Sequence, residues 1–181
     1  NKRKKLFLLN FFVLKLLCRA KLFLVTSDQE KKYTYKYVKD KSPIFVFPNF
    51  IEINDNPISE KKIQLKSGVI YLGRLHPKKG IENLIAGYEL LFQSGFTNHK
   101  LIIVGTGDKS YVNDLMKNIV NLKSATNIEF LGHKTGVHKR SLLLRSKVLV
   151  MPSYSENFGN VVLEALSEYT PVIASIFTPW D

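Results

Sequence analysis

The chain has 181 residues, of which 45% are hydrophobic, so it can form one domain with a core, or one domain and part of another. Its single cysteine, Cys18, excludes an internal disulfide and favours a reducing compartment such as the cytosol. The net charge of +12 favours a polyanionic partner, which leaves nucleic acid, an anionic membrane surface and a phosphorylated substrate as candidates.

The lysines that produce this charge cluster at residues 2–5, 31–41 and 61–66. No aromatic RNA-binding signature accompanies them, so we expect no nucleic-acid partner. A lysine-rich, AT-biased genome would produce the same balance without functional meaning. The charge alone therefore leaves a functional basic surface and a compositional bias as alternatives.

An apolar run extends from Leu6 to Cys18 and is interrupted only by Asn10 and Lys15. It is shorter than the about 20 apolar residues of a spanning helix, and no small-residue signal cleavage site follows it. We expect an amphipathic helix that packs on the protein or lies against a membrane. With the single cysteine, a cytoplasmic location is expected, and peripheral contact with the anionic inner face of the plasma membrane is one option. Because no initiator methionine is present, we also expect the chain to begin inside a longer protein.

Residues 21–66 predict a strand, a helix, a second strand and a linker. Residues 21–25 form an apolar strand pattern. Ser27 with Glu30 three residues later is typical of a capping box, so a helix is expected from there to about Val38. Residues 43–47 predict the second strand. The polar segment 54–66 contains Pro57 and is expected to be a linker.

From Ser67 onward, apolar strand patterns alternate with amphipathic helix patterns. This alternation predicts right-handed βαβ units and therefore an α/β fold, a Rossmann-like parallel sheet with flanking helices. The expected strands are 69–72, 100–104, 127–131, 147–150 and 172–175, and the expected helices are 81–92, 111–122, 137–145 and 160–169.

Three segments of interest follow the first two of these strands and span the end of the third. The first, residues 73–80 (GRLHPKKG), is rich in cations that could hold a phosphate, although a solvated basic loop is the alternative. The second, residues 105–108 (GTGD), fits a dinucleotide fingerprint only in part, because Ser110 stands where the third glycine would be. It is interpreted as a turn first and a ligand contact second. The third is residues 130–133 (FLGH).

The stretch 153–170 (SYSENFGNVVLEALSEYT) joins a strand to a helix and contains Glu156 and Glu164. Ligands of open α/β sheets bind at such junctions. Gly159 allows close approach of the backbone, and the first N–H groups of the helix suit a phosphate. A sugar joined through phosphates to a ribose matches this layout. The alternative is that both carboxylates merely favour the helix dipole or face solvent.

These residues resemble the E-x7-E signature of the group 1 retaining glycosyltransferases with the GT-B fold, of the family 4 type. The resemblance includes Pro152-Ser153 before Glu156, Phe158-Gly159 after it, and Leu163-Glu164-Ala165 around the second Glu. Residues 73–80 resemble the family's GRL…KG loop, and residues 48–52 resemble its interdomain step. The resemblance implies that residues 1–53 are the end of the N-terminal, acceptor-binding domain. Residues 54–66 would be the linker, and residues 67–181 a donor-binding domain truncated at its C-terminus.

By this resemblance, Arg74 and Lys79 would stabilise the leaving diphosphate, Glu156 would bind the transferred sugar, and Glu164 would bind the ribose. Lys78 is the alternative to Lys79, which fits better because it directly precedes Gly80. No Asp-x-Asp pair occurs, and His133 and His138 lack zinc-site spacing, so no metal and no cofactor are expected. The other expected donor-binding residues are Gly73, Gly105, Gly107, Phe130, Gly132, Asn157, Phe158, Gly159 and Asn160.

The implied function is transfer of a hexosyl group from a nucleotide diphosphate sugar to a glycan or lipid-linked acceptor, with retention. Bacterial surface polysaccharide or lipopolysaccharide synthesis is the expected setting. The alternative is a non-catalytic nucleotide-sugar binding module; a GT-B-like epimerase fits the paired motifs less well. The chain alone is not expected to catalyse transfer.

Overall fold

The computed structural model describes residues 13–17, 19–38, 41–52 and 66–180, and it divides into two units, Asn1–Asn49 and Phe50–Asp181. The predicted helix over residues 6–18 lies mostly outside the described residues, apart from α2 (Leu14–Leu17). Apart from Lys66, the predicted linker also lies outside them. No helix in the described ranges is long and apolar enough to cross a membrane.

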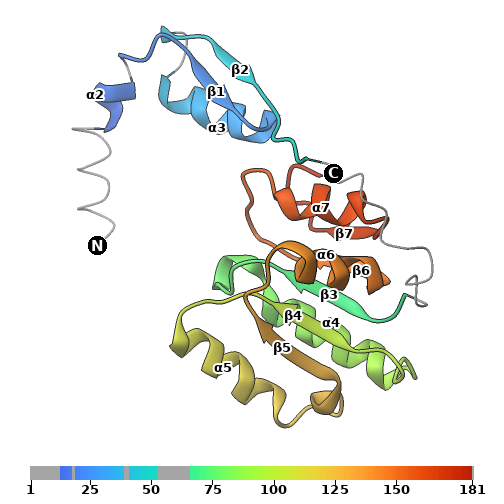
Figure 1. Cartoon of the computed structure of the whole chain (residues 1–181). Coiled ribbons are helices and arrows are strands. Elements are labelled where there is room, and N and C mark those ends of the chain that lie inside the picture. The colour runs from blue at the N-terminus through green and yellow to red at the C-terminus, as the bar shows by residue number, and fades with distance from the viewer. Residues whose placement is uncertain (1–12, 18, 39–40, 53–65, 181) are drawn as a thin grey trace. The chain divides into compact units, whose positions relative to one another are not determined.

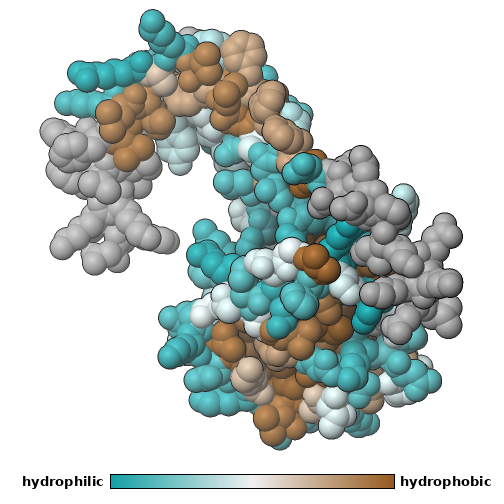
Figure 2. Space-filling model, viewed as in Figure 1, coloured by the Kyte–Doolittle hydropathy of each residue, from teal (hydrophilic) through white to brown (hydrophobic). Residues whose placement is uncertain are grey.

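The first unit is a βαβ element built from β1 (Phe23–Val25), α3 (Asp28–Val38) and β2 (Ile44–Val46). The two strands are parallel. The predicted helix cap is confirmed, because the Glu30 N–H donates to the Ser27 hydroxyl at 3.2 Å. The Glu30 carboxylate accepts from the Thr26 N–H at 2.7 Å, one residue earlier than an ideal capping box. Apolar residues gather on the surface of this unit (Figure 2), among them the exposed Leu22, Leu24, Phe45 and Phe47.

The second unit is a five-stranded parallel sheet of order β5-β4-β3-β6-β7 with helices on both faces (Figure 1). The predicted Rossmann-like α/β fold is therefore confirmed. The strands are β3 (Val69–Leu72), β4 (Leu101–Val104), β5 (Ile128–Gly132), β6 (Val148–Met151) and β7 (Val172–Ala174). The helices are α4 (Ile81–Gln93), α5 (Lys109–Ile119), α6 (Gly136–Arg145) and α7 (Asn160–Ser167), with short 3-10 turns η4 (Pro77–Lys79) and η5 (Ala125–Asn127).

Five helix bounds differ from the sequence prediction by one to three residues, the largest difference being the end of α5 at Ile119 in place of residue 122, and two of the five have a clear local cause. Helix α5 begins at Lys109, two residues earlier than predicted, because the Asp108 carboxylate accepts the Ser110 N–H at 2.9 Å and caps the helix. Helix α7 ends at Ser167, two residues earlier than predicted, because Tyr169 adopts a left-handed conformation with φ of 54°.

The strand order places the direction change of the chain between β3 and β6. Strands β4 and β5 are added in turn on one side of β3, and β6 and β7 are then added on its other side. At such a switch point, the loops after the two central strands diverge to opposite faces and leave a crevice between them. The loops after β3 and β6 carry Arg74, Lys79 and Glu156, the three residues expected to act in catalysis.

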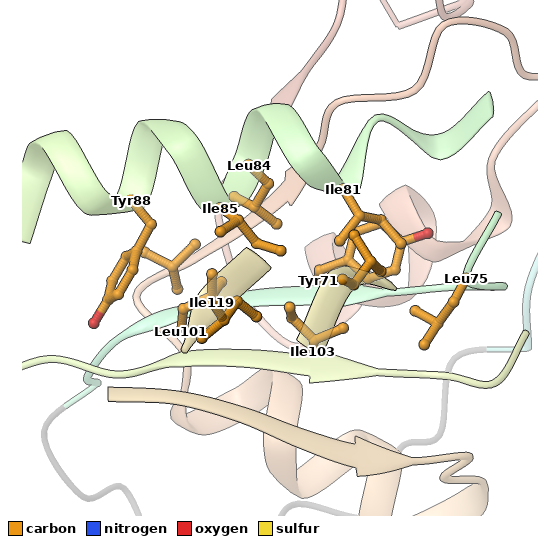
Figure 3. Close-up of a cluster of buried hydrophobic side chains, with 11 residues drawn as sticks. Tyr71, Leu75, Ile81, Leu84, Ile85, Tyr88, Leu101, Ile103 and Ile119 are labelled. Atoms are coloured by element: carbon orange, nitrogen blue, oxygen red, sulfur yellow. The ribbon is translucent and has the colours of Figure 1, made fainter. Parts of the chain in front are cut away.

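The core forms because neighbouring residues of each strand point to opposite faces of the sheet. Tyr71 and Ile103 pack with α4 and α5 on one face, where Ile81, Leu84, Ile85 and Tyr88 of α4 lie over the strands (Figure 3). Ile70 and Leu149 pack with α6 and α7 on the other face. Burial of each such side chain contributes about 1.5–3 kcal/mol, so both faces hold the central strands and their loops in place.

A buried carboxylate connects α4 to the turn before β5. The Glu89 side chain accepts from the Ser124 hydroxyl at 2.6 Å, the Ser124 N–H at 3.0 Å and the Lys123 N–H at 3.2 Å. It also accepts from the Gln93 amide at 2.5 Å. These donors, the Ser124 hydroxyl first and Gln93 second, lower the pKa of Glu89 to about 2.

We predict that Glu89→Gln lowers the thermal midpoint at pH 7, because an uncharged amide accepts these hydrogen bonds less strongly. The pKa of Glu89 is lower in the folded protein than its ordinary value of 4.5, so its contribution is full above about pH 4.5 and is lost as the pH falls towards 2. The difference between wild type and variant should therefore shrink across that range. Thermal melts followed by circular dichroism at several pH values measure this.

Glu129→Gln is the control, because Glu129 pairs with Lys100 at an exposed site, with a side chain 38% accessible, and should change the midpoint little. A Glu89→Gln variant that melts with wild type at pH 7 would contradict the assigned role.

Candidate functional site

A cleft of about 530 Å³ opens at the carboxyl ends of the central strands. Its wall is formed by the residues that follow β3, β4, β5 and β6, together with parts of α6 and α7. Eight of the predicted site residues line it: Gly73, Arg74, Lys79, Gly105, Glu156, Gly159, Asn160 and Glu164.

The basic loop after β3 is attached to the loop after β6. The His76 ring accepts the Lys78 N–H at 3.1 Å and so begins the turn η4. The Lys78 carbonyl then accepts the Tyr154 N–H at 2.9 Å. The Tyr154 hydroxyl in turn accepts from the Asn83 amide at 2.7 Å, which adds α4 to the same contact.

Gly80 is the residue that allows these two loops to approach. It adopts a left-handed conformation with φ of 63°, which disfavours any residue with a side chain. A Cβ atom at this position would also overlap the Pro152 carbonyl oxygen. The backbone contact between the two loops therefore requires glycine at residue 80.

The attached loops bring Lys79 and Glu156 into an ion pair with 2.5 Å between Nζ and Oε1. The side chains are 22% and 13% exposed, so solvent screens this pair only in part. The hydroxyl of the buried Ser153 donates to the same Oε1 at 2.8 Å. Both contacts use one oxygen of Glu156, which leaves Oε2 as an acceptor for a ligand on the cleft wall.

Arg74 is fixed through its backbone and not through its side chain. The Tyr71 hydroxyl donates to the Arg74 carbonyl at 2.9 Å. Burial, and secondly the negative charge of Glu156, raise the pKa of Tyr71, so this hydroxyl keeps its proton and remains a donor. Within the described residues the guanidinium of Arg74 forms no ion pair with a carboxylate, and it lines the cleft.

The turn that begins α7 is held by a tryptophan near the end of the chain. Gly159, with φ of 84°, precedes the helix, and a Cβ atom there would lie 3.1 Å from the Met151 sulfur and 3.4 Å from Trp180 Nε1. That indole N–H donates to the Phe158 carbonyl. The rings of Trp180 and Phe158 also pack edge to face, with 5.0 Å between their centroids. The helix N-terminus, whose first N–H groups suit an anion, is thus held at the cleft wall.

Glu164 lies on the cleft wall about one turn into α7, and Lys139 of α6 pairs with it at 2.8 Å. The cleft therefore contains two carboxylates, each held by a lysine. Among the described residues, two further cations on its wall, Arg74 and Lys134, form no ion pair. The excess of positive charge suits a polyanionic ligand.

Five predicted residues lie outside the cleft lining: Gly107, Phe130, Gly132, Asn157 and Phe158. Phe130 packs against the core, and Gly107 forms a bridge to Leu75. Gly132 contributes a backbone contact, because its carbonyl accepts the Gly105 N–H at 2.9 Å.

Sequence reasoning also missed part of the wall. The additional lining residues include Tyr71, Thr106, Lys134, Thr135, Lys139 and Ser153. Ser153 belonged to the recognised motif but was given no role, although its place before Glu156 could have suggested one. Lys139 carried no local signal, because its role depends on how α6 packs on α7. No group of three His, Cys, Asp or Glu side chains that could hold a metal occurs in the part of the chain that the structure describes.

Comparison with known sequences identifies a family. The sequence profile described as "Glycosyl transferases group 1" matches residues 53–179. An uncharacterized glycosyltransferase of Methanocaldococcus jannaschii is 37% identical over 59% of this chain and 26% of its own length. The capsular polysaccharide biosynthesis glycosyltransferase CapM of Staphylococcus aureus is 28% identical over 70% of this chain and 33% of its own length. The chain thus spans about a quarter to a third of these two relatives.

Among solved structures, Anabaena HepE in complex with UDP and glucose superposes with a TM-score of 0.72. The match covers 88% of this chain and 45% of HepE at 21% identity, so it indicates a shared fold only. The resemblance to the group 1 glycosyltransferases that the sequence motifs indicated is confirmed.

We predict that Gly80→Ala lowers the free energy of unfolding by about 1–3 kcal/mol, through backbone strain and overlap with the Pro152 carbonyl. Gly87→Ala is the matched control. Gly87 lies inside α4 with open space around an added Cβ, so alanine there should stabilise the helix by about 0.5–1 kcal/mol. Urea denaturation measures both. Equal stability of the two variants would contradict the proposed loop contact.

Proposed function

Because this chain belongs to the group 1 glycosyl transferases, whose profile covers residues 53–179, we propose that its cleft binds a nucleotide diphosphate sugar as the donor for glycosyl transfer. The observation that carries this proposal is the Lys79–Glu156 pair. It places a cation beside a carboxylate that can accept hydrogen bonds from hydroxyls, at the switch point of the sheet. A phosphorylated sugar needs both kinds of group within a few ångströms.

The diphosphate is proposed to bind between Arg74, Lys79 and the N-terminus of α7. When the sugar departs, negative charge develops on the phosphate oxygen to which it was attached. Cations and amide dipoles that are already fixed beside this oxygen stabilise the transition state more than the ground state. Arg74 is suited to this task because no described carboxylate competes for its guanidinium.

The two carboxylates are proposed to bind the hydroxylated groups at the two ends of the diphosphate. Glu156 would accept from hydroxyls of the transferred hexose through its Oε2, while Ser153 and Lys79 hold Oε1. Glu164 would accept from the ribose of the nucleotide. Retention of configuration at the anomeric carbon, and diphosphate stabilisation by side chains and amides without a metal, complete the proposal.

The acceptor is proposed to be a glycan or a lipid-linked sugar in bacterial surface polysaccharide synthesis, as the name of the CapM relative suggests. Exposed lysines of α3, such as Lys31, Lys32 and Lys36, give the first unit a basic surface that could contact an anionic membrane. Because the chain spans only part of its relatives, transfer is proposed for the whole enzyme. Donor binding is the step to test on this chain.

We predict that Arg74→Ala and Lys79→Met each weaken nucleoside diphosphate binding by about one to two decades. A hydrogen bond to a charged group is worth about 1.5–3 kcal/mol, and about 1.4 kcal/mol corresponds to a factor of ten. Calorimetric titration with UDP, GDP and ADP in the presence of EDTA measures this and tests metal independence together. Lys78→Met is the matched control, because Lys78 is on the same loop but does not line the cleft. Loss of affinity in Lys78→Met equal to that in Lys79→Met would contradict the assignment.

Glu156→Gln is predicted to weaken binding of the sugar part of the donor without weakening binding of the nucleotide part. Affinity for the nucleotide sugar should fall by about tenfold, the value of one hydrogen bond to a carboxylate. Affinity for the matching nucleoside diphosphate should stay unchanged or rise, because Lys79 loses its competing partner. Glu129→Gln, at an exposed site distant in the sheet, should change neither affinity. Equal losses for sugar nucleotide and diphosphate would overturn the role of Glu156, and retained transfer by a Glu156→Gln whole enzyme would count against catalysis at this site.

A further inference from the structure

Helices α6 and α7 are joined by two ion pairs, formed by two adjacent residues of α6 and two glutamates one helical turn apart at the end of α7. Lys139 pairs with Glu164 at 2.8 Å, and Arg140 pairs with Glu168. Both pairs connect the same two helices, but only Lys139 and Glu164 line the cleft. The Arg140–Glu168 pair lies outside it and is the more buried, with the Glu168 side chain 10% exposed.

The two ion pairs between α6 and α7 differ in their surroundings. The pair outside the cleft joins α6 to α7 beside the apolar cluster that contains Leu143, Val162 and Ala165, and it involves the less accessible of the two carboxylates. The Lys139–Glu164 pair, with side chains 28% and 27% exposed, is partly screened by solvent and contributes little to stability as an isolated pair. Its place on the cleft wall therefore calls for an explanation beyond helix packing.

The contact fixes the direction of the Glu164 carboxylate. A glutamate side chain loses considerable rotamer freedom when it is held in one geometry. Lys139 holds Oε1 before any ligand arrives, so less of this freedom remains to be lost when a ligand hydroxyl donates to the other oxygen. Lys139 thus resembles Lys79, which holds Oε1 of Glu156 in the same way.

We propose that Lys139 is a positioning residue for Glu164, and that this pair makes the cleft selective for a ribose with free hydroxyls over one that lacks them. The inference rests on the proposed nucleotide-sugar function and deepens it, because it assigns sugar discrimination in the nucleotide to a contact between α6 and α7. It predicts that loss of the lysine matters only when the ligand carries the hydroxyls that Glu164 accepts.

The test compares Lys139→Met, Lys139→Arg and wild type on the full 181-residue chain by calorimetry. The ligands are whichever of UDP, GDP and ADP binds most tightly and its 2′,3′-dideoxy form. Lys139→Met is expected to weaken ribonucleotide binding by about 3- to 10-fold more than dideoxynucleotide binding, the effect of releasing one long side chain. Lys139→Arg should restore most of the difference, because it keeps a cation beside Glu164.

Arg140→Met is the matched control. It removes the neighbouring ion pair between the same helices, so it should lower the thermal midpoint while leaving the ratio of ribo- to dideoxynucleotide affinity unchanged. A change in that ratio equal to the change in Lys139→Met would show that helix packing, and not positioning, controls selectivity, and would overturn the inference.

Glu164→Gln and the double variant Lys139→Met/Glu164→Gln complete the experiment. Glu164→Gln should reduce the affinity ratio, and the double variant should reduce it no further, because the lysine acts through the carboxylate. Equal weakening of both ligands by Lys139→Met would identify a phosphate contact and overturn positioning. A wild-type chain that binds both ligands equally would overturn the inference alone, whereas one that binds no nucleoside diphosphate would overturn the proposed function with it.

Discussion

The site depends on the attachment of one loop to another across the switch point of the sheet. The Tyr154 N–H donates to the Lys78 carbonyl, and Gly80 lets the backbones approach at Pro152. Without this contact, Lys79 and Glu156 would be on separate loops, each free to move. Two groups that must bind one ligand together benefit from a fixed geometry, because side chains on mobile loops would lose more conformational freedom when the ligand binds.

The cleft combines paired and unpaired charges with different tasks. Two lysines hold carboxylates, and these carboxylates can then accept from hydroxyls in a fixed direction. In the described residues, Arg74 and Lys134 have no carboxylate partner, so their charge is available to an anion. A ligand with two hydroxylated ends and a negative centre is complementary to this arrangement. A free sugar would leave the cations unsatisfied, and inorganic phosphate would leave the carboxylates unused.

The sequence was informative where a local pattern determines structure. Strand β3 begins and ends as predicted, because an apolar run between glycines leaves little choice. That Arg74 and Glu156 share one cleft followed from the parallel sheet, which brings the ends of its strands to one edge. The pairing of Lys139 with Glu164 could not be predicted, because it depends on how two helices pack. Phe130 was expected to bind the donor, yet its position in β5 directs its side chain to the core.

The contact between Trp180 and the Phe158 carbonyl has a practical consequence. This indole is the only one in the chain, and it lies against the turn that begins α7, next to Gly159 on the cleft wall. Its emission therefore comes from a single known position. The protein carries a built-in optical reporter of its own ligand site, with no second chromophore of that type to obscure the signal and no need for a chemical label.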